Sequence, residues 1–183
     1  MFDDEAQLIH RARAGDPQAL AALYDCYQPA IYTYLYYRLD DQAIAEELTS
    51  EVFVRMVEKI DRYQARGQPI LAWLYTIARN LRADHYRRAN SAQRLPLDET
   101  LAADGDDPPQ TVEHQLAADC LRRALRHLTG DQQEVILHKF VDDHSNAEVA
   151  VLLGKDEGAV KSLQHRALAA LRRAIEKERC YEP

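Results

Sequence analysis

Hydrophobic residues recur at helical spacing in both halves of the chain. The first stripe covers residues 17–31 and begins after Asp16-Pro17, a capping residue followed by proline at the first helical position. Pro29 is expected to kink or break this helix. A second stripe follows Asp40-Asp41 and repeats every four residues, as Ile44, Leu48, Val52, Met56 and Ile60. Both segments are therefore predicted to be amphipathic helices.

A third helix is predicted over ILAWLYTIARNLRADHYRRAN, residues 70–90. Its apolar stripe comprises Ile70, Trp73, Leu74, Ile77 and Leu81, so Trp73 is expected in the core. Asn80, Asp84 and Arg87 share another side of the helix. Residues 79–94 carry five arginines against one acidic residue, next to tyrosines. Such a pattern favours binding of single-stranded nucleic acid. Arginines near the carboxy-terminal end of a helix also interact favourably with the helix dipole, which is the alternative explanation.

The carboxy-terminal part contains clear helix boundaries. Leu121, Leu125 and Leu128 predict a helix, and Thr129-x-x-Gln132 and Ser145-x-x-Glu148 each match a capping box that opens another. Gly154 is placed to end the latter helix, and Asp156 to cap the next one. A helix, a short turn and a second helix form the helix-turn-helix arrangement.

The final predicted helix has two distinct sides. Projection at about 100° per residue groups the apolar residues Val160, Leu163, Ala167, Leu171 and Ile175. The opposite side carries Gly158, Ser162, His165 and Ala169, flanked by Lys161 and Arg166. Small and polar residues framed by cations suit the major groove of DNA. A solvated face of an ordinary bundle helix is the alternative.

Charge divides the chain, whose net charge is -7, into three parts. Residues 91–115 contain six acidic residues against one arginine, and three of the seven prolines. This composition predicts an acidic flexible linker between two folded domains, residues 1–90 and residues 116–183. The predicted fold class is therefore all-α, with two small helical domains. A local basic surface is compatible with the global acidity.

Several functional classes lack their sequence signals. The three cysteines show no metal-ligand spacing, the seven histidines form no HExxH-like pair, and no glycine-rich phosphate loop or nucleophile motif is present. No metal, no cofactor and no enzymatic activity are therefore predicted, and the thiols are expected to be reduced. The chain has no apolar run of about 18 residues and an acidic start, which predicts a cytoplasmic protein without membrane insertion.

Three stretches, taken together, resemble a known family: AIAEELTSEVFVRMVEKIDRY, ILAWLYTIARNLRADHYRR and LTGDQQEVILHKFVDDHSNAEVAVLLGKDEGAVKSLQHRALAALRR. They are similar, in this order, to the bacterial sigma factors of the sigma-70 family, in particular the two-domain extracytoplasmic-function (ECF) group. The resemblance implies region 2 in the first domain and region 4 in the second. It implies a non-catalytic protein that binds core RNA polymerase and promoter DNA, directs initiation and is held inactive by an anti-sigma factor.

The resemblance also implies roles for individual residues. Polymerase binding would involve Glu47, Ser50 and Glu51, with Leu48, Val52 and Phe53 packed inside. Contacts to the minus-10 element, including a flipped base, would involve Tyr63, Gln64, Arg66, Asn80, Asp84, Arg87 and Arg88. Contacts to the minus-35 duplex would involve Lys155, Glu157, Gly158, Lys161, Ser162, His165 and Arg166. The chain departs from the family pattern at Glu47, at Ser50 and at Leu163-Gln164.

Two other functions compete with this interpretation. A stand-alone helix-turn-helix regulator would bind duplex DNA by itself, with a steep salt dependence. It leaves the AIAEELTSEVF and WLYTIARNLRADHYRR stretches without a role. A metal-dependent nucleic-acid enzyme using the clustered carboxylates would show turnover with magnesium or manganese.

Overall fold

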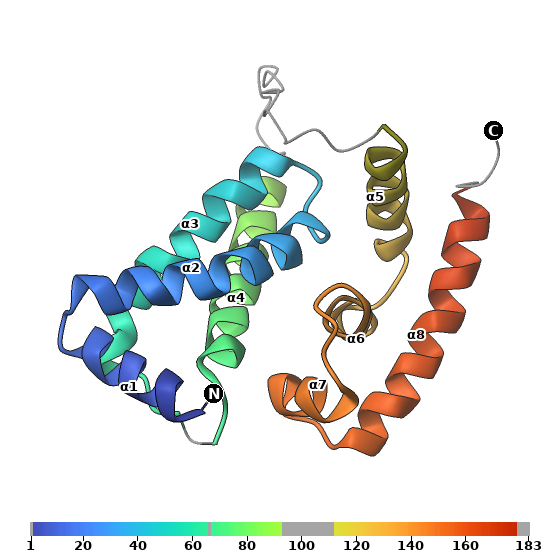
Figure 1. The fold of residues 1–183 in the computed structure, drawn as a ribbon. Helices are drawn as coiled ribbons and strands as arrows, with labels where there is room; N and C mark the ends of the chain where they lie inside the picture. Colours follow the sequence, from blue (N-terminus) through green and yellow to red (C-terminus); the bar gives the residue numbers. More distant parts are fainter. Residues whose placement is uncertain (1, 66, 93–111, 179–183) are drawn as a thin grey trace. The chain divides into compact units, whose positions relative to one another are not determined.

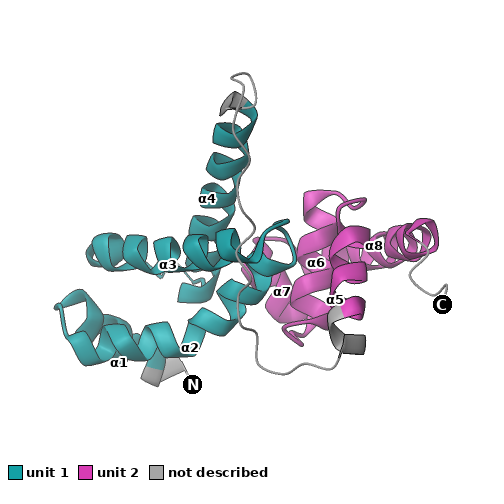
Figure 2. Ribbon diagram, turned by 90° about the horizontal axis from the view of Figure 1, so that it is seen from above, with its two compact units in different colours: residues 1–103 teal, residues 104–183 magenta. Residues whose placement is uncertain are grey.

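The computed structural model describes residues 2–65, 67–92 and 112–178, and these residues form helices and connecting turns without a strand (Figure 1). The chain divides into two compact units, residues 1–103 and 104–183 (Figure 2). Unit 1 contains α1 (Phe2–Arg13), α2 (Pro17–Tyr36), α3 (Gln42–Lys59), the 3-10 helix η1 (Ile60–Arg62) and α4 (Ile70–Ala92). Unit 2 contains α5 (Val112–Leu125), α6 (Gly130–Phe140), α7 (Asn146–Leu153) and α8 (Glu157–Lys177). The all-α prediction is confirmed.

The core of unit 1 lies where α2, α3 and α4 pack against one another. Its fully buried side chains include Leu23, Ile31, Leu35, Val52, Met56, Ile70 and Leu74. The four-residue stripe predicted for α3 accordingly faces inward, from Leu48 to Ile60, although Ile44 is only half-buried. α1 packs against α2 and against η1.

Local capping explains where α2 and α3 begin. The Asp16 carboxylate accepts from the backbone N–H groups of Gln18 and Ala19, at 2.9 and 3.4 Å, and Asp41 does the same for Ala43 and Ile44 at 2.8 and 3.4 Å. Each carboxylate satisfies donors that the first turn of a helix leaves free. Both predicted starts are confirmed.

Two features of unit 1 differ from the sequence prediction. α2 runs through Pro29 as one helix, so of the predicted kink or break, the break does not occur. The helix α1 was not predicted, because its apolar residues are few; only Ala12 among its described side chains is buried.

Unit 2 follows its predicted boundaries. Thr129 and Gln132 form one capping box and Ser145 and Glu148 the other, each with both reciprocal hydrogen bonds. Gly154 ends α7 in the left-handed conformation, with φ 62°, which favours glycine. The core between α6, α7 and α8 comprises Val135, Val149, Ala150, Val160 and Leu163. The helix-turn-helix of α7 and α8 is therefore supported by a hydrophobic core.

The region between the units was predicted as a linker over residues 91–115. α4 extends to Ala92 and α5 begins at Val112, so both ends of that range are helical, and residues 93–111 lie outside the described residues.

Within the described ranges, no helix is long and apolar enough to cross a membrane, and no cluster of three metal-ligating side chains occurs. Cys26 is a free thiol whereas Cys120 is disulfide-bonded, so the expectation of reduced thiols is wrong for Cys120.

Candidate functional site

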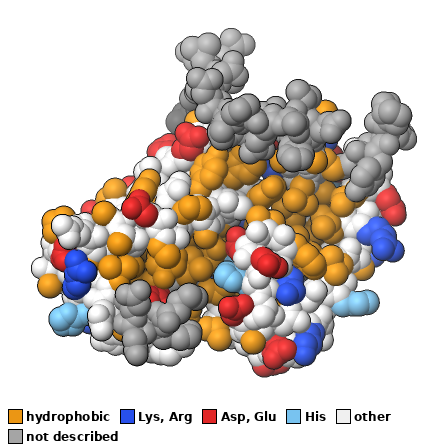
Figure 3. All heavy atoms as spheres, viewed as in Figure 1, with side chains coloured by type: hydrophobic (Ala, Val, Ile, Leu, Met, Phe, Trp, Pro, Cys, Tyr) orange, Lys and Arg blue, Asp and Glu red, His pale blue; other side chains and the backbone are white. Residues whose placement is uncertain are grey.

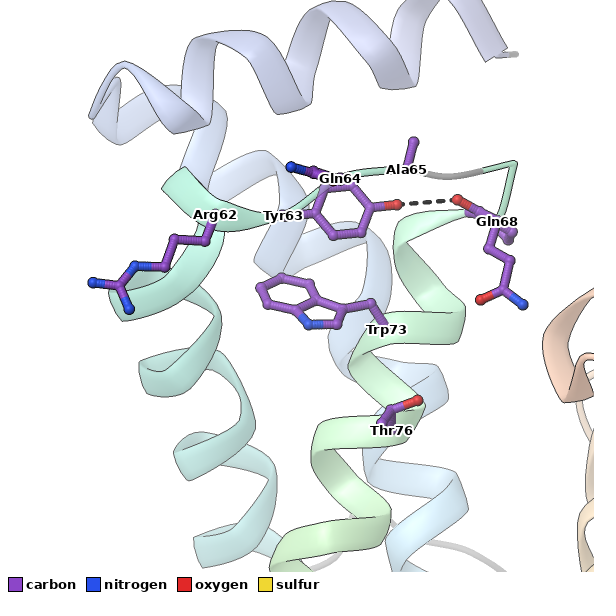
Figure 4. Close-up of a pocket in the computed structure, with 8 residues that line it drawn as sticks. Arg62, Tyr63, Gln64, Ala65, Gln68, Trp73 and Thr76 are labelled. Atoms are coloured by element: carbon purple, nitrogen blue, oxygen red, sulfur yellow. Dashed lines mark hydrogen bonds between the residues drawn. The ribbon is translucent and has the colours of Figure 1, made fainter.

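An open pocket lies in unit 1, where the segment after η1 turns into α4 (Figure 4). Its cavity has a volume of about 330 Å³, close to the lower end of the range of about 300–1,000 Å³ usual for small-ligand sites. It is lined by Arg62, Tyr63, Gln64, Ala65, Gln68, Pro69, Trp73 and Thr76. The pocket therefore combines two aromatic rings with polar groups from one loop and the first turns of one helix.

The two aromatic rings form one wall. The ring centroids of Tyr63 and Trp73 are 5.0 Å apart with an interplanar angle of 37°, and the tyrosine ring lies over the indole (Figure 4). Tyr63 is only 8% exposed, and its hydroxyl donates to the carbonyl of Gln68 at 3.1 Å. Burial, and secondarily the nearby Glu5 carboxylate, raise the pKa of Tyr63 to about 12, so the phenol keeps its proton at neutral pH. Tyr63 therefore stabilises the loop through a buried ring and a hydrogen bond to the Gln68 backbone.

A left-handed glycine allows the loop to fold back over the pocket. Gly67 has φ 78°, and no atom lies within 4 Å of a Cβ built there, so backbone strain rather than space favours glycine. The turn is closed by the N–H of Gln68, which donates to the carbonyl of Ala65 at 2.6 Å.

The structure places some of the predicted minus-10 residues at this pocket. Tyr63 and Gln64 line it, whereas Arg66 lies outside the described residues. Trp73 was predicted in the core, but it is half-buried and lines the pocket, because the chain segment that covers it leaves one side open. Sequence reasoning also missed Thr76, although its position one turn after Trp73 on α4 could have indicated it.

The remaining minus-10 candidates continue along the same side of α4. Trp73, Thr76, Asn80, Asp84 and Arg87 follow each other at spacings of three or four residues, which keeps them on one helix face. Asn80 and Arg87 are exposed and Asp84 is half-buried. Arg87 forms an ion pair with Asp84. Arg88, also exposed, lies beside this strip, so a polar face leads away from the pocket.

A second exposed strip lies on α3. Glu47 and Ser50 are exposed and Glu51 is half-buried, paired with Arg55 at 2.8 Å. Leu48, Val52 and Phe53 are buried, which confirms their predicted inward packing. The same strip continues into Val54 and Val57, each 51% exposed, which sequence reasoning missed. Figure 3 shows hydrophobic side chains at the surface on the face drawn there. The strip therefore places exposed apolar side chains next to acidic ones.

In unit 2, all seven predicted minus-35 residues are exposed: Lys155, Glu157, Gly158, Lys161, Ser162, His165 and Arg166. Asp156 caps α8 by accepting from the N–H of Ala159 at 2.8 Å. The opposite side of α8 is buried at Val160, Leu163 and Ala167 and half-buried at Leu171 and Ile175. The predicted projection of this helix is therefore confirmed.

Two lysines at the start of α8 and in the turn before it, Lys161 and Lys155, form ion pairs with acidic residues of unit 2. The Lys161 ammonium lies 2.9 Å from the Glu157 carboxylate, and the Lys155 ammonium lies 3.2 Å from Asp131. Both pairs are solvent-exposed, so each contributes at most about 1 kcal/mol and can be exchanged for another anion.

Two family models match the chain. The model described as Sigma-70 region 2 matches residues 23–92, and the model described as Sigma-70, region 4 matches residues 118–171. These ranges include the pocket and α4 in unit 1, and α6, α7 and most of α8 in unit 2. α1 lies outside both matched ranges.

Two bacterial sigma factors align with most of the chain. The ECF RNA polymerase sigma factor BldN of Streptomyces coelicolor is 40% identical over 171 residues, 92% of this chain and 65% of that protein. The chain thus spans slightly less than two thirds of that relative's length. The ECF RNA polymerase sigma factor SigX of Bacillus subtilis is 31% identical over 162 residues, 84% of this chain and 82% of that protein.

A solved structure supports the fold. The sigma factor RpoE of Bartonella quintana, crystallised with the anti-sigma factor NepR, matches with a TM-score of 0.61. The match has 22% identity and covers 85% of this chain and 96% of that one. At this identity the similarity concerns the fold alone.

Proposed function

The chain belongs to the ECF group of the sigma-70 family and directs transcription initiation through RNA polymerase, and from this premise we propose how its parts divide the work. Residues 1–90 bind the polymerase and capture the minus-10 element, and residues 116–183 read the minus-35 element. Residues 91–115 join the two. As a sigma factor, the protein is not an enzyme, and it works in the cytoplasm, where the polymerase is.

The pocket beside Trp73 receives one unpaired base of the minus-10 element. The observation that carries this proposal is the open, aromatic-walled cavity at the start of a polar helix face. Stacking on an aromatic ring stabilises a base by about 1–3 kcal/mol, which offsets the few kcal/mol that unstacking costs. Asn80, Arg87 and Arg88 then contact the bases or phosphates that follow, because they lie along the same helix.

The strip on α3 contacts the polymerase. Glu47, Ser50 and Glu51 supply polar groups, and the exposed Val54 and Val57 supply apolar area that burial would stabilise. Burying both kinds of side chain in one contact gives affinity from the valines and orientation from the acids.

α8 enters the major groove at the minus-35 element. Its exposed side carries Gly158, Ser162 and His165, small or polar residues that fit against base edges. Lys155, Lys161 and Arg166 contact phosphates, with Glu157 between them. The cap at Asp156 fixes where the helix starts, and therefore which side chains come first into the groove.

An anti-sigma factor regulates the protein. Membership of the ECF group implies such a partner, and RpoE, which has the same fold, is a sigma factor crystallised with one. The exposed valines on α3 offer such a partner the same apolar area as the polymerase, so the two would compete.

The polymerase contact is tested first, by gel filtration of the protein with bacterial core RNA polymerase. The variant Glu47→Lys is compared with Glu176→Lys, the same charge reversal at an exposed acid on α8, away from the α3 strip. We expect stoichiometric binding that Glu47→Lys weakens and Glu176→Lys leaves unchanged. Equal binding by both variants would refute the assignment of this strip.

A further inference from the structure

α1 reaches both ends of the loop that carries the pocket. At one end, the Arg13 guanidinium donates to the carbonyl of Asp61 in η1 at 3.0 Å. At the other, the Glu5 carboxylate accepts from the backbone N–H of Ile70, the first residue of α4, at 3.2 Å. Most of the pocket lining comes from the loop between these two anchors, namely from residues 63–65, 68 and 69. One helix therefore holds both the entry and the exit of the loop.

The Glu5 contact satisfies a group that has no other partner within its helix. The first N–H groups of a helix lack intrahelical acceptors, and the Ile70 side chain is fully buried, which restricts access of water. A carboxylate at this position also interacts favourably with the positive end of the α4 dipole. Trp73 stands one turn further along α4. Fixing the start of α4 therefore fixes the position of the indole.

A second hydrogen bond holds Glu5 in place. The same carboxylate oxygen accepts from the hydroxyl of Tyr27 on α2 at 3.0 Å. Burial, and then the Glu5 charge, raise the pKa of Tyr27 above its ordinary range, so the hydroxyl remains a donor. Because α2 belongs to the core of unit 1, this bond connects the anchor to the rigid part of the unit.

We propose that α1 is a positioning element for base capture, in which Glu5 and Arg13 hold the two ends of the loop so that the Tyr63–Trp73 wall stays open to an unpaired base. Neither residue lines the pocket. Both act through the loop and the start of α4 and are positioning residues. The inference rests on the proposed function of the pocket, and it gives α1, outside the matched family ranges, a role in recognition.

The test uses holoenzyme assembled from bacterial core RNA polymerase and the full chain. A promoter is first selected from random DNA with the wild-type holoenzyme. Two templates are then made from it, one fully paired and one forked with the minus-10 non-template bases unpaired. The variants are Glu5→Ala, Glu5→Gln, which keeps an acceptor oxygen, and Arg13→Ala. Arg11→Ala is the control, since Arg11 lies on the same helix but pairs with Asp16 at its exposed surface.

We expect Glu5→Ala to weaken binding to the forked template on the order of tenfold, because a hydrogen bond to a charged group is lost and the Ile70 N–H is left without it. Glu5→Gln should restore most of the affinity. Arg13→Ala should weaken binding about two- to fivefold, and Arg11→Ala should not change it. Binding to core polymerase should be equal for all variants.

A second readout follows the pocket directly. Trp73 is the chain's one tryptophan, so in the free protein its emission and its quenching by acrylamide report the pocket wall. Glu5→Ala should shift the emission, and Glu5→Gln should return it.

The outcomes separate the inference from the function on which it rests. A wild-type holoenzyme without preference for the forked template would refute base capture itself. Wild-type preference together with unchanged affinity of Glu5→Ala and Arg13→Ala would overturn the role of α1 and leave the function standing. Should Glu5→Ala not fold, Arg13→Ala decides: unchanged forked-template affinity overturns the proposal.

Discussion

Replacing Trp73 by alanine should remove the platform for the captured base without unfolding unit 1. Base stacking contributes about 1–3 kcal/mol, so binding to a forked minus-10 template should weaken by about 5- to 150-fold. Truncating a fully buried tryptophan costs about 3–5 kcal/mol, but Trp73 is half-buried, so the loss of stability should be smaller. The core residues of α4, including Ile70, Leu74 and Leu81, remain in place.

The assay compares the affinity of the holoenzyme for forked and fully paired templates, alongside thermal unfolding of the free protein. Trp73→Phe is the matched control, because it keeps an aromatic face and should retain most of the forked-template affinity. The reasoning would be refuted if Trp73→Ala bound the forked template as tightly as the wild type. An equal loss on both templates would also refute it, because the effect would then not concern the unpaired base.

Further expectations concern both units. Changing Lys161 and Arg166 to alanine should lower the slope of log affinity against log salt by about 0.9 for each lost phosphate contact, measured on minus-35 DNA; an unchanged slope would exclude such contacts. Asn80→Ala should slow open-complex formation on duplex promoters while polymerase binding by gel filtration stays intact. Gly154→Ala forces alanine to φ 62° and should cost about 1–2 kcal/mol in denaturant unfolding; no change would contradict the need for glycine there. Because folding raises the pKa of Tyr63 from 10.0 to about 12, its contribution to stability is complete below pH 10 and is lost as the pH rises toward 12. Denaturation between pH 9 and pH 12 should show a smaller loss of stability in Tyr63→Phe than in the wild type, because the raised pKa of Tyr27 contributes to the loss in both.

Features set by neighbouring residues could be predicted from the sequence. Asp16, Asp41, Thr129 and Ser145 each cap a helix through groups two or three residues away, so local spacing was sufficient. The left-handed Gly154 likewise follows from its own conformational freedom.

Features set by tertiary packing could not be predicted in this way. Trp73 has the helical spacing of a core residue, and only the path of the loop before α4 decides that one side of its ring stays open. α1 is held partly by single polar contacts over long sequence separations, such as Glu5 to Ile70, which leave no periodic signal. Pro29 occupies a helix interior without breaking it, although proline is disfavoured there, because packing of α2 against α1, α3 and α4 stabilises the helix.

The acidity of the chain also has a consequence for how it finds DNA. If Lys161 and Lys155 contact phosphates as proposed, each must first leave its present partner, Glu157 or Asp131. Since the ion pairs are exposed and weak, replacing each carboxylate by a phosphate costs little free energy. It still reduces the net electrostatic stabilisation that the lysines would contribute to binding free DNA. Attachment to the polymerase should change this balance, because tethering raises the effective concentration of a domain at its site. We therefore expect weak binding of the free protein to promoter DNA and much tighter binding by the holoenzyme, which a filter-binding comparison of the two would check.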